Sequence, residues 1–193
     1  MYNSLKEKKV PAYLFFTYAL LMVVVFILSY QNSNLLATTI STVVLVSLAI
    51  LVGVGYFLFH MKNASMVGYI ILLCYHIMYS IVNCTYAADI NPNAPTIINA
   101  AFILKIVELL PAIIILVLAI VNFTNNKGNF GKIIVVLLIL IGLINFVAEL
   151  MAGIYGFSSG QEMGGVIYIL SGFAYLALYL GFASDIENIK MTF

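Results

Sequence analysis

Residues 133–156 read IIVVLLILIGLINFVAELMAGIYG, and Glu149 is the only charged residue among them. An α-helix of this length rises about 36 Å at 1.5 Å per residue. The hydrocarbon core of a bilayer is about 30 Å thick, and a segment that crosses it needs about 20 apolar residues. The stretch therefore predicts a membrane-spanning helix with a single carboxylate inside it.

The composition of the whole chain agrees with a lipid environment. Of its 193 residues, 64% are hydrophobic and 8% are charged, whereas soluble domains are about 25% charged. Mean hydropathy is +1.15. The net charge is +1 and the chain has no arginine, so no basic patch is available to neutralise the phosphates of a nucleic acid.

Five further apolar stretches resemble 133–156 in length, and short polar segments separate them. The first is too long for a signal-peptide core and lacks a small-residue cleavage site, so we expect it to be retained. The predicted fold is all-α: a polytopic integral membrane protein in which one domain, 1–193, forms a six-transmembrane-helix bundle. The spans are expected at about 10–30, 35–59, 66–87, 96–121, 133–156 and 165–183.

The lysines predict the orientation of this bundle, because cytoplasmic loops are enriched in positive charge. If the N-terminus is cytoplasmic, every lysine outside the spans falls on the cytoplasmic side, and Asp89 and Glu162 fall outside. We therefore predict that both termini are cytoplasmic and that the protein resides in the cell membrane. These lysines are Lys6, Lys8, Lys9, Lys62, Lys127, Lys132 and Lys190.

Four ionisable residues lie inside the predicted spans: His76, Lys105, Glu108 and Glu149. A charged group at the bilayer centre costs about 2.5–3.5 kcal/mol on insertion scales, so such residues suggest a function. Lys105 and Glu108 lie about 14 and 18 Å along their span, and all four groups fall between the midplane and the outer interface. With the polar residues Ser80 and Asn145, they form the candidate ligand- or ion-binding site.

Pro111 follows Glu108 by three residues. Proline removes a backbone donor and displaces the carbonyl four residues earlier, which predicts a helix kink beside the charges. Interrupted helices are a common way to build a transporter site at the midplane.

Two interpretations of these charges remain open. Lys105 and Glu108 share a helix face and could neutralise each other, which would make the charges structural. Two glutamates against one lysine instead leave a carboxylate that can carry a proton or meet a solute. The leading hypothesis is a transport or solute-binding subunit. The alternatives are a structural or regulatory subunit whose charges fix helix packing or partner docking, and an intramembrane enzyme.

Small residues at regular spacing predict close helix packing and leave open a homo-oligomer or a partner membrane subunit. They are Ala148, Ala152 and Gly156 in one span, and Ala174, Ala177 and Gly181 in the next.

Motifs for catalysis or cofactor binding are weak. Residues 156–160, GFSSG, match the G-x-S-x-G pattern, but no histidine follows His76 and a membrane helix precedes the serines. His76 and Cys84 would lie about 12 Å apart along a helix, too far for direct activation of the thiol. Cys74 and Cys84 form neither a disulfide framework nor a zinc motif, so no cofactor or metal is expected.

Overall fold

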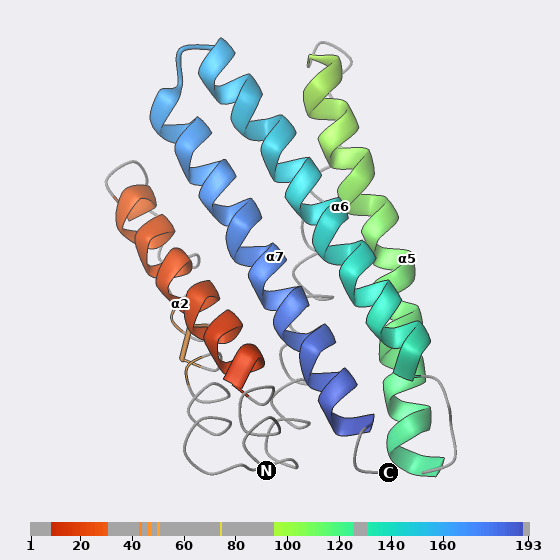
Figure 1. Ribbon diagram of the computed structural model, residues 1–193. Helices are drawn as coiled ribbons and strands as arrows, with labels where there is room; N and C mark the ends of the chain where they lie inside the picture. Colours follow the sequence, from red (N-terminus) through yellow and green to blue (C-terminus); the bar gives the residue numbers. More distant parts are fainter. Residues whose placement is uncertain are drawn as a thin grey trace.

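A computed structural model describes residues 9–30, 95–125 and 131–190, with five isolated positions at 43, 46, 47, 50 and 74. The three described ranges contain four α-helices, shown in Figure 1: α2 (Lys9–Tyr30), α5 (Thr96–Asn125), α6 (Gly131–Ser158) and α7 (Glu162–Lys190). The spans expected at 35–59 and 66–87 lie outside the described residues, save for those isolated positions. The six-helix count therefore stays a prediction.

All four helices are long and apolar enough to cross a membrane, which confirms the prediction of long apolar helices at these positions. The crossing segments are Val10–Ser29, Thr96–Leu118, Ile133–Ser158 and Glu162–Ser184. Large apolar side chains such as Leu20, Leu110 and Val136 are more than 60% exposed. Such a surface would be unfavourable in water but matches the acyl chains of lipid. The chain is a multi-pass membrane protein.

The helices extend beyond the predicted spans at several ends. α5 continues to Asn125 where 121 was expected, and α7 begins at Glu162 where 165 was expected. Hydropathy delimits only the part of a helix that lies in hydrocarbon. Hydrogen bonding carries the helix on to its cap, so polar residues outside the apolar run remain helical.

The helices lie in the spatial order α2, α7, α6, α5, and each packs against the next (Figure 1). Neighbours are antiparallel: α2 and α6 run one way, α5 and α7 the other (Figure 1). α7 therefore has a neighbour on two sides, one face against α2 and another against α6. Residues of α5 and α7 both border α6, which places side chains from three helices within reach of one another.

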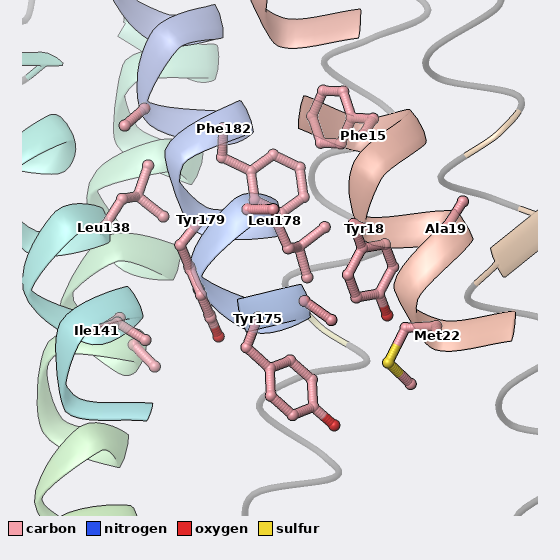
Figure 2. Packing of buried hydrophobic residues seen from close by; sticks show 14 of the residues in the cluster. Phe15, Tyr18, Ala19, Met22, Leu138, Ile141, Tyr175, Leu178, Tyr179 and Phe182 are labelled. Carbon is pink, nitrogen blue, oxygen red and sulfur yellow. The ribbon is translucent and has the colours of Figure 1, made fainter. Parts of the chain in front are cut away.

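The contact between α2 and α7 is aromatic (Figure 2). The rings of Phe15 and Phe182 meet edge to face, with centroids 5.2 Å apart and planes at 68°. Gly181 makes room for this contact, because a Cβ atom there would lie 3.3 Å from the Phe15 ring. Tyr18 and Leu178 are fully buried beside the pair.

α6 and α7 form a hairpin whose backbones come very close near its tip. A Cβ atom on Gly156 would lie 2.8 Å from the Gly165 backbone nitrogen, and one on Gly165 would lie 2.9 Å from the Gly153 carbonyl oxygen. Real Cβ atoms do not tolerate such distances to backbone. Glycine at these positions is what permits the approach, as in other membrane helix pairs that use small residues.

The same close packing recurs at seven-residue intervals along the hairpin. Glu149 is seven residues before Gly156 and lies against Gly172, where an added Cβ would be 3.1 Å from the Glu149 Cβ. Gly142 is seven residues before Glu149, and a Cβ atom there would lie 2.9 Å from the Tyr179 Cβ. A seven-residue period keeps one seam of each helix facing the other, so the hairpin has a single register that fixes which residues meet.

The turn of the hairpin is a Schellman cap. The Gln161 amide donates to the Gly156 carbonyl at 2.8 Å, and the Gly160 amide donates to the Phe157 carbonyl at 3.2 Å. Gly160 has φ +78°, the left-handed conformation that this cap requires. The cap reverses the chain within three residues, so α7 starts directly beside the end of α6.

Candidate intramembrane charge site

An ion pair joins α5 to α6 in the interior of the bundle. The Lys105 Nζ lies 2.6 Å from the Glu149 Oε1, and the side chains are 27% and 5% exposed. The sequence suggests Glu108, on its own helix, as the partner of this lysine. In the structure Lys105 instead reaches the neighbouring helix, while Glu108 is close enough to both groups to interact with them electrostatically.

Glu108 is the most buried of the three charged residues, at 2% exposure. Its side chain is hydrogen-bonded to Asn145 on α6 and to Tyr179 on α7. The site therefore draws on three helices: Lys105 and Glu108 from α5, Asn145 and Glu149 from α6, and Tyr179 from α7. A buried polar group without such partners would cost several kcal/mol in hydrocarbon.

The positions of the carboxylates follow from helical periodicity. On α5 the buried residues Ala101, Glu108 and Ile115 recur every seven residues, so Glu108 occupies a position otherwise apolar on the packed face. Lys105 is three residues before Glu108 and lies at the edge of that face, which accounts for its greater exposure. The packed face of α5 thus holds its carboxylate inside the bundle and its ammonium at the border.

The packed face of α6 carries the second pair of polar residues. Ile141, Asn145 and Glu149 follow at four-residue steps, and all three are buried. The Asn145 Nδ2 donates to the Ile141 carbonyl at 3.5 Å, which occupies one of its two N–H groups and leaves the other for Glu108. Asn145 thus bonds both to the backbone of its own helix and to Glu108 on α5.

Gly172 sets the position of Glu149. The close approach at this glycine brings the α7 backbone against the base of the Glu149 side chain, with Phe146 on the same side. Phe146 itself packs against Phe173, with ring centroids 5.0 Å apart. The carboxylate is thereby backed by α7 and faces α5, where Lys105 meets it.

The described part of the site combines one ammonium with two carboxylates. The ammonium pairs with Glu149, so the hydrogen-bond partners of Glu108 are the uncharged amide of Asn145 and the hydroxyl of Tyr179. Both can donate to a carboxylate, and both can also accept from a carboxylic acid. Such an arrangement can hold a proton, a small cation or the cationic group of a solute.

The structure brings four of the six predicted binding residues together: Lys105, Glu108, Asn145 and Glu149. His76 and Ser80 lie outside the described residues, so their part in the site stays a prediction. α5 remains helical through Pro111, which is buried. The proline therefore does not divide α5 into two helices, and the bend expected there stays a prediction.

Two residues of the site were not expected from the sequence. Tyr179 lies in an apolar span and carries no sequence motif, yet it is 1% exposed and bonds to Glu108. Gly172 was not included among the packing residues. A signal for both exists, because Gly165, Gly172 and Tyr179 are seven residues apart and mirror Gly142, Glu149 and Gly156 on α6.

The predicted packing residues lie in different environments. Ala148, Ala174 and Ala177 are buried, and Ala152 is half-buried. Gly156 contacts α7, whereas Gly181 faces α2. The stretch GFSSG forms the end of α6 and its cap. Its serine hydroxyls, Ser158 and Ser159, donate to the carbonyls of Tyr155 and Gly156, which is a capping role.

Comparison of this chain with protein-family models, with curated proteins and with solved structures finds no match.

Proposed function

We propose that this protein is a small membrane transport or solute-binding subunit whose intramembrane site consists of Lys105, Glu108 and Glu149. The observation that carries the proposal is that two buried carboxylates and a single lysine meet where three helices join. Buried charge in a membrane is expensive, and it is typical of ion pathways and proton relays.

The charge balance favours a binding role over a purely structural one. A pair of one lysine and one glutamate is sufficient to link α5 to α6. Glu108 adds a second carboxylate only a short distance away, and its hydrogen bonds are to uncharged partners. The charge of Glu108 is not needed to balance that pair, and it supplies a group that an exchangeable cation can neutralise.

We further propose that the termini face the cytoplasm and that the site lies in the outer half of the membrane. The start of α2, the start of α6 and the end of α7 lie at one end of the bundle (Figure 1), and lysines occur at each of them: Lys9, Lys132 and Lys190. Glu162 begins α7 at the opposite end. This distribution supports a cytoplasmic location for the lysine-bearing end.

The proposal is tested with the purified full-length chain reconstituted into lipid vesicles. Uptake of a panel of cationic and zwitterionic solutes, with and without an imposed proton gradient, is compared among wild type, Glu108→Gln and Glu149→Gln. We expect wild type to take up at least one class of solute and both variants to lose that uptake. Full uptake in both variants would exclude the site. Glu162→Gln, at an exposed position outside the site, is the matched control.

A structural subunit is the second candidate, and one observation favours it: the Lys105–Glu149 pair is fully formed and backed by the close contact at Gly172. Under this alternative, replacing Lys105, Glu108 and Glu149 together by apolar residues of similar size preserves folding and partner assembly. Under the transport proposal the same triple variant folds but takes up nothing.

A further inference from the structure

The three charged residues of the site have different kinds of partner. Glu149 has an ammonium, which can donate hydrogen bonds but cannot accept them. The Lys105 ammonium lies 2.6 Å from the Glu149 Oε1 and donates to it, but it offers no acceptor to a carboxylic acid. Protonation of Glu149 would break the link between α5 and α6.

Glu108 has partners of the other kind. The Tyr179 hydroxyl and the Asn145 amide each contain both a donor and an acceptor, so they can satisfy the carboxylate and the carboxylic acid in turn. The hydroxyl does so by rotation, with no movement of the ring. The charged groups that face Glu108 from the described helices are Lys105 on its own helix and Glu149 on α6, and their electrostatic effects on Glu108 oppose each other.

We propose that Glu108 is the exchangeable proton site of the protein, and that the Lys105–Glu149 pair is a fixed element that holds the site together. In the loaded state the Glu108 O–H bond is intact and the acid donates to Asn145 or Tyr179. On release the O–H bond breaks, the proton passes to water, and the carboxylate accepts hydrogen bonds from the same two side chains. This inference builds on the proposed function, because it names the proton as the coupling ion at the same site.

Infrared difference spectroscopy of the full-length chain in lipid vesicles tests the assignment. A carboxylic acid in an apolar site has a carbonyl stretch that is absent from the carboxylate, so a change of pH reveals which groups exchange a proton. We expect a titrating acid band in wild type and in Glu162→Gln, and its loss in Glu108→Gln. Glu149→Gln removes the negative partner of Lys105. In this variant the acid band of Glu108 is therefore expected to shift in frequency but to remain. A band that survives in Glu108→Gln, or that disappears in Glu149→Gln, overturns the assignment.

A second measurement needs no variant. An apolar carbodiimide dissolves in the bilayer and adds to carboxylic acids, whose proton passes to a carbodiimide nitrogen while the oxygen bonds to its carbon. The adduct rearranges to a stable acylurea that mass spectrometry locates. Labelling of Glu108 should exceed that of Glu149, because the partners of Glu108 can accept a proton from the acid form and the ammonium beside Glu149 cannot. Labelling mainly at Glu149, or at neither residue, contradicts the proposal.

Neither measurement requires a transported solute, so each can succeed or fail independently of the proposed function. If uptake persists in Glu108→Gln while the band titrates at Glu108, transport through this site is excluded and the proton assignment stands. If uptake is lost in Glu108→Gln but no band titrates, transport through this site stands and the proton assignment is excluded. Addition of Na⁺ or K⁺ at constant pH should leave the band unchanged, and its disappearance would mean that a metal ion occupies the site in place of the proton.

Discussion

The ammonium of Lys105 lies 2.6 Å from a carboxylate oxygen of Glu149, although 44 positions separate the two residues in the chain. The pair connects α5 to α6, while the hydrogen bonds of Glu108 are to the uncharged side chains of Asn145 and Tyr179. The inference that Glu108 is the exchangeable group depends on this division, so the energetics of the pair are the first property to measure.

Lys105→Met should destabilise the protein more than the double change Lys105→Met with Glu149→Leu. The single change leaves Glu149 buried without its ammonium, at a cost of roughly 3 kcal/mol, whereas the double change removes both charges and is nearly neutral. Unfolding free energies in mixed micelles titrated with SDS give the comparison. Equal destabilisation by the single and double variants would mean that the two residues contribute independently.

Tyr179→Phe should weaken the site without disturbing the fold. The ring still fills its place against Gly142, but Glu108 loses one hydrogen bond, which is worth about 1–3 kcal/mol when the remaining partner is buried and charged. The titrating acid band of Glu108 should therefore move to a different pH and a different frequency. Tyr168→Phe is the control, because Tyr168 is exposed near the hairpin tip. A band unchanged in Tyr179→Phe would remove the tyrosine from the site.

The membrane class and the four described helices could be predicted because hydropathy depends on composition over about 20 residues. The placement of Lys105 and Glu108 on one side of α5 follows from their three-residue spacing. The partner of Lys105 could not be predicted in the same way. It depends on the register between α5 and α6, and intrahelical spacing makes Glu108 look equally suitable.

Tyr179 and Gly172 could not be predicted from spacing within one helix. Their importance depends on the register of the α6–α7 hairpin, which the Schellman cap at Gly160 fixes. A one-residue change in the turn would bring other side chains against Glu149. The polar residues 157–164 predict a loop, whereas helix covers all of them but Ser159, Gly160 and Gln161, so the length of the polar segment does not give the register.

Gly160→Ala should destabilise the hairpin through the backbone alone. Nothing lies within 4 Å of an added Cβ, so no steric contact is made, but φ +78° costs a non-glycine residue about 1–2 kcal/mol. Gly160→Asn should cost less, because asparagine tolerates this conformation better than alanine does. Thermal unfolding in detergent checks the order of the three proteins. Equal stability of the alanine and asparagine variants would argue against strain at this position.

Gly156→Ala should be more harmful than Gly164→Ala, although the two glycines are on the same hairpin and the changes are chemically identical. A Cβ on Gly156 would lie 2.8 Å from backbone, which cannot yield as a side chain can, so the helices must separate. We expect a cost of about 1–3 kcal/mol, as for other overpacked contacts. The nearest atom to a Cβ on Gly164 is 3.8 Å away, and alanine there should be neutral or mildly stabilising because it favours helix more than glycine does.

Because separation at Gly156 moves α7 relative to Glu149, Gly156→Ala should also shift the acid band of Glu108, and Gly164→Ala should not. A shift in both variants, or in neither, would mean that the close approach near the tip does not determine the geometry of the charge site.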